Sequence, residues 1–355
     1  MDLTTELQQQ VQDACHRRTP LNITGGNSKS WYGREATGEP LAVAGHRGII
    51  SYMPSELVIT ARAGTPLTEI AEALDEHGQR LPFDPPHFAA SATIGGTVAC
   101  NFSGPRRPYA GSCRDFMLGC TILNGRGERL HFGGEVMKNV AGFDISRLMA
   151  GSLGTLGVLL DVSLKVLPHR QAEQTLVLDA GFAEAIAMMN RWANTPLPVT
   201  AMCSDGQRVY LRICGTSSAV QRSMHDIGGR IFEDGKHFWK ALREHQLPFF
   251  QTDTPLYRLS LPPATRFAPL AGTTDSDWFI GWGGAQRWLK SDLPFATVQT
   301  YAAELGGHAR LLRGGDRSGE VFAPLPPALM QLHQRLKQGF DPAGILNPGR
   351  MYRDL

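Results

Sequence analysis

The chain contains 355 residues, of which 42% are hydrophobic and 19% are charged, and its formal net charge is +2. This composition is typical of a soluble globular protein with a substantial core, and the small net charge argues against nucleic acid as a partner. No apolar run is long enough to span a membrane, and no signal peptide follows Met1. The six cysteines form no C-x-x-C pair, so we expect free thiols in a cytoplasmic protein without an iron–sulfur or zinc site.

The N-terminal part of the chain is predicted to contain a helix, four short strands and a second helix. The first helix covers residues 2–15, and the strands cover residues 21–23, 41–43, 49–52 and 57–63. In the second helix the apolar side chains between Leu67 and Leu74 fall on one face. Thr65 is the expected N-cap, Pro66 the first helical residue and Gly78 the stop signal.

The middle and C-terminal parts contain a hairpin, a long strand and a mixed α+β segment. The hairpin covers residues 116–132 and turns at Asn124-Gly125, and apolar side chains alternate along the strand at 158–166. From residue 171 the order is strand, helix, strand, strand and helix, which is typical of a ferredoxin-like domain. Further strands are expected at 257–261 and 278–282, and a final helix at 329–338.

Three glycine-rich segments in the first half are candidates for binding an anion. They read TGGNSK at 24–29, ATIGGTVACNFSG at 92–104 and GSLGTLG at 151–157. Consecutive backbone N–H groups in such loops can converge on a phosphate, and a helix that opens after residues 93–96 would add its N-terminal N–H groups. Taken singly, each segment is explained as well by a plain turn. No P-loop motif and no G-x-G-x-x-G motif of a Rossmann fold is present.

Together the loops resemble the FAD-binding domain of the vanillyl-alcohol oxidase / p-cresol methylhydroxylase (PCMH) family. The likeness is carried by ELVITARAGTPL at 56–67, LPFDPP at 81–86, ATIGGTVACN at 92–101, GTLG at 154–157 and DPAGILNPGRMY at 341–352. Longer stretches such as SGPRRPYAGSCRDFMLG and DWFIGWGGAQRWLK resemble the smaller FAD-binding subunits of bacterial glycolate oxidases, along nearly the full length.

This resemblance implies an α+β fold made of three parts. A two-part PCMH-type FAD-binding domain is expected at 1–170 and a ferredoxin-like α+β cap domain at 171–325. A C-terminal segment at 326–355 is expected to pack back near the flavin.

The same resemblance implies which residues bind FAD. The first pyrophosphate loop would consist of Thr24, Gly25, Gly26, Asn27, Ser28 and Lys29, and the second of Thr93, Ile94, Gly95 and Gly96. The same wall would include Pro86, Ala99, Asn101, Ser103 and Gly104. Gly154, Gly157 and Val158 would face the other end of the cofactor, and Asn347 would approach the isoalloxazine ring. Members with covalent flavin carry His in the first loop, where this chain has Asn27, so the resemblance implies noncovalent FAD.

No single motif identifies the residues that would act on a substrate. Oxidation of a 2-hydroxy acid needs a cation for the carboxylate and a base for the hydroxyl proton. Catalytic relatives carry a Gly-Glu-His-Gly segment with metal-binding His, whereas this chain has GGHARLLRGGDRSG at 306–319, so no metal site is expected. His308 is a candidate base and Arg310 or Arg313 a candidate carboxylate ligand; a solvated basic strand edge is the competing interpretation.

Three further pairs are candidates, namely Arg106-Arg107, Arg114-Asp115 and Lys138-Asn139. Surface charge or an internal ion pair explains each of them as well.

The resemblance implies a subunit of a complex that oxidises glycolate to glyoxylate. We favour electron transfer by this chain's FAD between a larger catalytic flavin subunit and an iron–sulfur subunit, with glycolate bound by the partner. The complex would be cytoplasmic or held peripherally at the inner face of the cell membrane. Two alternatives stay open, an independently catalytic FAD-dependent 2-hydroxy-acid dehydrogenase and an assembly subunit with structural FAD. The UDP-N-acetylmuramate reductases, which share the fold, are a distant alternative.

Overall fold

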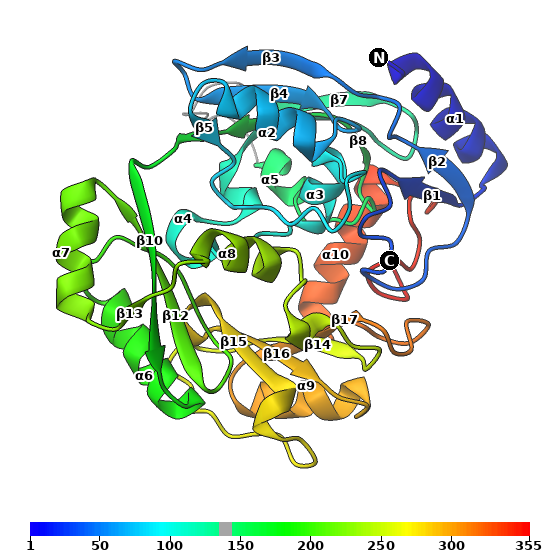
Figure 1. The fold of residues 1–355 in the computed structure, drawn as a ribbon. Coiled ribbons are helices and arrows are strands. Elements are labelled where there is room, and N and C mark those ends of the chain that lie inside the picture. Colours follow the sequence, from blue (N-terminus) through cyan, green and yellow to red (C-terminus); the bar gives the residue numbers. More distant parts are fainter. Residues whose placement is uncertain (135–143) are drawn as a thin grey trace.

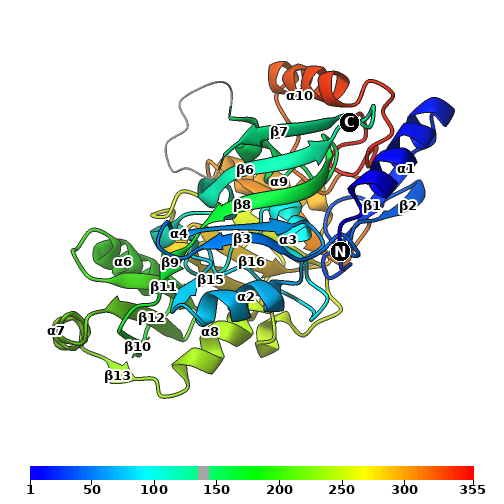
Figure 2. The same ribbon diagram turned by 90° about the horizontal axis from the view of Figure 1, so that it is seen from above.

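A computed structural model describes residues 1–134 and 144–355 and contains two large sheets. The first is antiparallel, and Figure 2 shows its strands side by side. In spatial order these are β3 (Ile49–Met53), β4 (Val58–Arg62), β8 (Val158–Lys165), β6 (Met117–Leu123) and β7 (Arg129–Gly133). Apolar side chains on both faces of β8 are buried, so this strand lies inside the core and not on a half-exposed sheet face.

Short helices cover this first sheet. They are α2 (Leu67–Asp75), α3 (Ile94–Cys100) and α5 (Ile145–Met149), with η1 (Cys113–Phe116) leading into β6, whereas α4 (Arg107–Ala110) packs against the second large sheet. Leu67, Ile70 and Leu74 of α2 are each at most 1% exposed, as the predicted apolar face requires. The predicted cap of α2 is wrong. Pro66 occupies the N-cap position, and the Thr65 hydroxyl instead bonds to the main chain of Gly48.

A small two-stranded sheet joins the two ends of the chain. Helix α1 (Thr4–Arg17) precedes β1 (Leu21–Thr24), which pairs in parallel with β2 (Glu39–Ala42). After α10 (Pro327–Phe340) the chain comes back to β1, where Leu346 forms a parallel bridge with Leu21. The first predicted glycine-rich loop therefore starts beside the C-terminal segment (Figure 1).

The second large sheet has eight strands in the order β13-β10-β12-β11-β15-β16-β14-β17. Its first four strands, with α6 (Phe182–Ala193) and α7 (Ser217–Ile227), form the predicted ferredoxin-like unit. These strands are β10 (Ala172–Asp179), β11 (Val199–Ser204), β12 (Arg208–Gly215) and β13 (Arg230–Ile231), and the others are β14 (Leu256–Ser260), β15 (Trp278–Gly281), β16 (Gln286–Lys290) and β17 (His308–Arg313).

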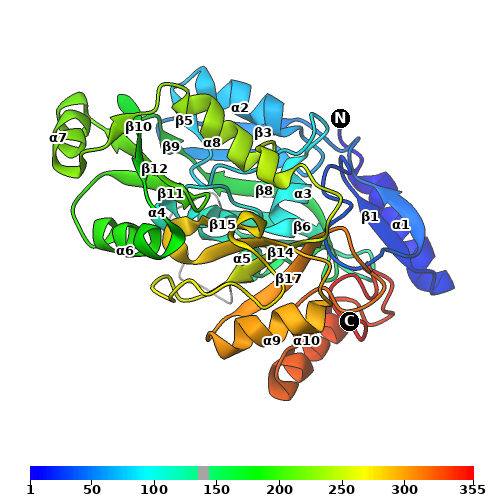
Figure 3. The same cartoon turned by 60° about the horizontal axis from the view of Figure 1, so that its bottom comes forward.

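The remaining helices lie on the two sides of the second sheet. Helix α8 (Gly235–Arg243) lies between the two halves of the molecule, whereas α6 and α9 (Phe295–Glu304) lie on the far side of the sheet (Figures 1 and 3). Short elements β5 (Gln79–Arg80), β9 (Leu167–Pro168), η2 (Pro248–Phe250), η3 (Asp275–Asp277) and η4 (Trp282–Gly284) complete the fold.

The two halves meet through shared apolar side chains. Tyr32, Phe102 and Leu153 belong to the N-terminal half of the chain but pack into the core of the eight-stranded sheet. The two sheets draw their strands from residues before and after about 170, and the division at 170 and 326 stays a prediction. Lys138 and Asn139 lie outside the described residues.

Candidate functional site

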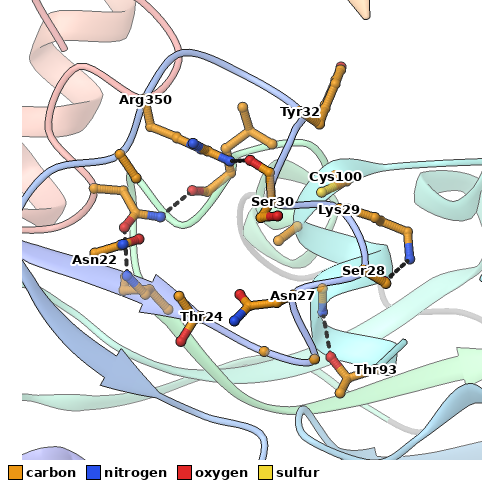
Figure 4. A pocket seen from close by; sticks show the side chains of 18 of the residues that line it. Asn22, Thr24, Asn27, Ser28, Lys29, Ser30, Tyr32, Thr93, Cys100 and Arg350 are labelled. Atoms are coloured by element: carbon orange, nitrogen blue, oxygen red, sulfur yellow. Dashed lines mark hydrogen bonds between the residues drawn. The ribbon is translucent and has the colours of Figure 1, made fainter. Parts of the chain in front are cut away.

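The loop after β1 forms one wall of a cavity of about 600 Å³, which we call the loop cavity (Figure 4). The N–H groups of Gly26, Asn27, Ser28 and Lys29 have no hydrogen-bond partner among the residues of the described ranges. Asn27 adopts a left-handed conformation with φ of 55°, which turns the loop within two residues. Four consecutive free donors make this loop suited to an anion.

The opposite wall is helix α3, whose contribution differs from the sequence expectation. Thr93 is the N-cap, and its hydroxyl accepts a long hydrogen bond of 3.3 Å from the Gly96 N–H. The N–H groups of Ile94 and Gly95 instead donate to the carbonyls of Thr65 and Ala63. These two N–H groups are therefore already hydrogen-bonded within the protein, and the start of the helix offers fewer free N–H groups than predicted.

The glycines of the loops allow segments of the main chain to pack closely against neighbouring parts of the protein. A Cβ on Gly26 would lie 1.5 Å from the Ser91 carbonyl oxygen, and one on Gly95 would lie 2.6 Å from the Ala63 Cβ. A Cβ on Gly25 would lie 2.7 Å from the Thr93 hydroxyl, so the two loops approach each other at these points. Glycine is required here because the main chains meet without room for a side chain.

The third wall comes from residues 153–157 and the C-terminal segment. Asn347 is 6% exposed; its Oδ1 accepts from the Ile23 N–H at 2.8 Å and its Nδ2 donates to the Leu153 carbonyl at 2.6 Å. Gly154 is needed because a Cβ there would lie 2.8 Å from that same Nδ2. Asn347 thus ties three segments together and shapes the cavity with an amide that is already hydrogen-bonded.

The loop cavity is positively charged. Lys29 is 7% exposed, and among the described residues its ammonium hydrogen-bonds only to the Ser28 hydroxyl at 3.2 Å and the His87 carbonyl at 3.4 Å. Burial lowers the pKa of Lys29, which shows that the buried charge lacks full compensation. Arg317 and Arg350 also line the cavity, and they donate to main-chain carbonyls. An anionic ligand would supply the missing partner.

The predicted cofactor residues are distributed over several places. Most of them line the loop cavity or the small cavity of about 70 Å³ that continues from it, namely Thr24, Gly25, Gly26, Asn27, Ser28, Lys29, Thr93, Gly95, Gly96, Ala99, Gly154, Gly157 and Asn347. Ile94 and Val158 are buried in the core. Pro86, Ser103 and Gly104 line a narrow space of about 40 Å³ between the two halves, and Asn101 lines the cavity described next.

A second cavity of about 570 Å³ adjoins the loop cavity through Tyr32, Cys100 and Leu153, which line both. We call it the arginine cavity, because Arg107, Arg258 and Arg310 line it and no carboxylate of the described residues does. Arg258 on β14 lies directly opposite Arg310 on β17. Like charges at such positions repel each other, so the pair is unfavourable without an anion.

The arginines of this cavity are held without ion pairs. Burial and the nearby Arg310 lower the pKa of Arg258 to about 9, and its Nε has no hydrogen-bond partner among the described residues. Arg310 donates to the Tyr32 hydroxyl at 2.7 Å, and its Nε also lacks a partner there. Arg107 lies 4.5 Å from the centre of the Trp282 ring. Three cations around an open space favour binding of a carboxylate or phosphate.

His308 lies at the exposed rim of the arginine cavity. Partial burial, together with Arg310 and Arg258, lowers the pKa of His308, so the imidazole is neutral at neutral pH. Of the other candidates, Arg313 donates to the Phe250 carbonyl, Arg106 pairs with Glu173, and Arg114 is exposed. No cluster of His, Cys, Asp or Glu that could hold a metal ion occurs among the described residues.

Residues with strained backbone conformations line these two cavities. Five non-glycine residues with positive φ line one or both of them, namely Asn27, Asn101, Leu153, Trp282 and Asn347. For bulky side chains such as Leu153 and Trp282 this conformation is rare and costs about 1–3 kcal/mol. Strain of this kind persists where the surrounding structure enforces it, which supports a functional site at the junction of the two cavities.

Comparisons with known proteins agree with these features. Residues 3–133 match the model of the FAD binding domain family. The 4-ethylphenol oxidase from Gulosibacter chungangensis has the same fold, with a TM-score of 0.76 over 99% of this chain and 88% of that chain at 15% identity. The free loop donors beside the buried Lys29 fit a pyrophosphate. Fold and site thus define an FAD-binding oxidoreductase of the PCMH type.

Two relatives in sequence show to which group of FAD-binding oxidoreductases the chain is similar. The glycolate oxidase subunit GlcE of Escherichia coli K12 is 47% identical over 354 residues, covering 100% of this chain and 99% of that protein. The glycolate oxidase subunit GlcD of Bacillus subtilis 168 is 32% identical over 129 residues, or 36% of this chain and 27% of that protein. The chain therefore belongs to the GlcE family of FAD-dependent oxidoreductase subunits. In the described ranges no helix is long and apolar enough to cross a membrane.

Several lining residues were missed in the sequence. Tyr32, Arg317 and Arg350 line the loop cavity, and Arg258 lines the arginine cavity. A signal existed for Arg258, since it is the one charged residue in the mainly apolar run LYRLSL. Arg350 lies in the C-terminal segment NPGRMY, where only Asn347 was considered.

Proposed function

We propose that the loop cavity binds FAD without a covalent bond. Lys29 and the free N–H groups of residues 26–29 would hold the pyrophosphate, and the walls at 93–99 and 153–157 would enclose the rest of the cofactor. This proposal is carried by the row of free donors beside a buried lysine that has no ion pair in the described part of the chain. Asn27 offers no nucleophile, and burial raises the pKa of the Cys100 thiol to about 11, which keeps it protonated and unreactive.

Acid precipitation tests this binding mode. We expect yellow cofactor in the supernatant after the purified chain is precipitated, because nothing but noncovalent contacts would hold it. Flavin that stays with the denatured pellet would contradict the proposal.

The complex in which the chain works would be a glycolate oxidase. Support comes from the full-length similarity to the E. coli GlcE subunit. Bound FAD supplies a carrier that accepts and donates one or two electrons. In this complex the chain's own residues would hold and orient the flavin and shield it from water, and its electrons would pass between a larger catalytic flavin subunit and an iron–sulfur subunit.

The arginine cavity favours a second candidate function, a hydroxy-acid site in this chain. Arg258 and Arg310 would hold a carboxylate, and the neutral imidazole of His308 would accept the hydroxyl proton. The cavity supports this candidate because it adjoins the loop cavity and holds cations without any carboxylate partner. A carboxylic acid drawn to these cations would lie beside the space assigned to the flavin.

Rapid mixing of the isolated chain with glycolate separates the two functions. For electron transfer we expect flavin that dithionite reduces and glycolate does not. For a hydroxy-acid site, glycolate would bleach the flavin, Arg258→Met would abolish the bleaching, and the matched variant Arg222→Met on the exposed face of α7 would retain it.

Turnover of the assembled complex gives an independent measure. If the chain transfers electrons, His308→Ala should leave the turnover rate of the complex within about tenfold of the wild-type rate, which is a barrier change of about 1.4 kcal/mol or less. A loss of about a hundredfold or more would identify His308 as the base and overturn that function.

A further inference from the structure

A third cavity, of about 560 Å³, lies where the two halves of the chain meet, and it shares no lining residue with the loop cavity or the arginine cavity. Its N-terminal-half residues include Arg80 and Arg106, and its C-terminal-half residues include Arg212. Helix α8 contributes Lys236, Lys240 and Arg243, which lie on one helix face because they are spaced by three or four residues. We call this space the polybasic cavity.

The carboxylates around the polybasic cavity compensate only part of its charge. Within the part of the chain that the structure describes, Asp84 and Glu173 are the only acidic residues in its lining. Arg106 Nη2 lies 2.8 Å from Glu173, while Arg243 and Arg212 share Asp84 at 3.2 and 3.6 Å. The remaining cations, Arg80, Arg170, Lys236 and Lys240, have no ion pair or side-chain hydrogen bond within residues 1–134 and 144–355.

Two of the arginines are also poorly solvated. Arg212 is 4% exposed, and its Nη2 has no hydrogen-bond partner in the described part of the chain. Arg80 is half-buried with a partnerless Nε, and burial and the nearby Arg106 lower its pKa to about 10. The ion pair of Arg212 with Asp84 is shared with Arg243, and Arg80 has no ion pair among the described residues, so keeping these buried cations together costs stability.

We propose that the polybasic cavity binds a small polyanion, a metabolite that carries phosphate or carboxylate groups with two or more negative charges. Several uncompensated cations converge on one concave space, which favours a ligand with more than one charge. The volume is that of a small-molecule pocket and not of a protein groove. Glycolate, with one charge, is not the ligand expected here, and the proposal is independent of the proposed function of the flavin site.

Ligand binding would join the two halves of the molecule, since each half supplies cations. A bound polyanion would replace repulsion among Arg80, Arg106 and Arg212 by attraction, and the folded state would gain stability by mass action. The expected signature is therefore a saturable rise in melting temperature.

The test uses the flavin-loaded chain, with pyrophosphate and citrate as probes and NaCl at matched ionic strength as reference. We expect either probe to raise the melting temperature saturably above the NaCl reference and to give a calorimetric binding isotherm. A stronger effect of pyrophosphate identifies a phosphate ligand, and a stronger effect of citrate identifies a polycarboxylate. If neither probe exceeds the NaCl reference, the proposal is wrong.

Variants show whether the probes bind in this cavity. The double variant Lys236→Gln/Lys240→Gln, on the exposed face of α8, should weaken binding at least tenfold without loss of flavin. Arg80→Gln should weaken binding while the melting temperature without probe does not fall, because an uncompensated charge is removed. Arg222→Gln, on the exposed face of α7, should leave binding unchanged. Unchanged binding in both cavity variants would overturn the proposal.

Discussion

The loop cavity and the arginine cavity adjoin each other but are built in different ways. The loop cavity is lined on one side by a glycine-rich loop, and its free donors are main-chain N–H groups of four consecutive residues, 26–29. The arginine cavity is lined by side chains of α4, β14 and β17, which are far apart in the sequence. A site formed by the main chain of consecutive residues can therefore be recognised as a sequence motif. A site formed by side chains from different strands has no such motif, because its residues are scattered along the sequence.

The largest effect is expected for Gly26→Val, which tests whether the loop cavity depends on close main-chain contact. The new Cβ would lie 1.5 Å from the Ser91 carbonyl, so the two loops would have to separate. We expect little folded protein, and no flavin in what is folded, measured as yield and as the flavin-to-protein absorbance ratio.

The matched control for this glycine is Gly339→Ala in α10, where a Cβ meets nothing within 4 Å. It should keep its flavin and change the free energy of unfolding by no more than about 1 kcal/mol, in the stabilising direction. Full flavin content in Gly26→Val would show that the loops do not meet as described.

A smaller effect is expected for Asn347→Ala, which tests the third wall of the loop cavity. The change leaves the Ile23 N–H and the Leu153 carbonyl without partners and places Ala at a φ of 42°. Each unpaired group costs about 1–3 kcal/mol and the backbone conformation about 1–2 kcal/mol, so we expect a loss of about 3–8 kcal/mol in chemical denaturation.

Asn194→Ala is the comparison for this amide, because the exposed Asn194 side chain bonds only within its own helix end. Its effect should stay within about 0.5 kcal/mol. Equal effects of the two substitutions would mean that Asn347 does not hold the wall.

The smallest effect concerns His245, which is buried beside the narrow space between the two halves and stacks on Phe250 with ring centres 4.4 Å apart. Burial, with Arg313 and Arg258, lowers the pKa of His245 from 6.5 to about 3. The unfolded chain therefore binds this proton more readily, and stability falls as the pH drops from about 6.5 toward 3. Between pH 7 and pH 5 this one group should cost about 2 kcal/mol.

His245→Phe keeps the ring stacking and removes the titration, so its free energy of unfolding should fall about 2 kcal/mol less than that of the wild type between pH 7 and pH 5. The exposed His225 provides the control, since His225→Gln should follow the wild-type pH profile. Parallel profiles for wild type and His245→Phe would show that the buried ring does not resist protonation.

Much of the fold could be predicted from the sequence, because periodic apolar patterns depend on local spacing. The face of α2 from Leu67 to Leu74, the hairpin around Asn124 and the strand–helix order after residue 171 all have such patterns. Helix α8 was not predicted, and the residues of β17 were considered as a base and carboxylate ligands or as a solvated basic edge. Charged residues of both elements line cavities, and the polarity of the sequence alone does not specify that position.

The candidate site was only partly predictable. The glycine-rich loops were found as candidates for binding an anion, whereas the contacts of Gly26 with Ser91 and of Gly95 with Ala63, which require glycine, depend on tertiary packing. The N–H groups of Ile94 and Gly95 were expected to be free, and their partners at Thr65 and Ala63 are known only once β4 and α3 are packed together.

The sequence by itself determined the family, the glycine-rich loops and the two kinds of α+β unit, because these depend on residue types in a fixed order. The tertiary structure decided which charges meet. Arg258 and Arg310 are 52 positions apart in the chain and become direct neighbours only through the pairing of β14 with β17. Arg80 and Arg212 likewise meet at one cavity only because the two halves pack together. Electrostatic interaction depends on distance in space, which the order of residues along the chain does not specify.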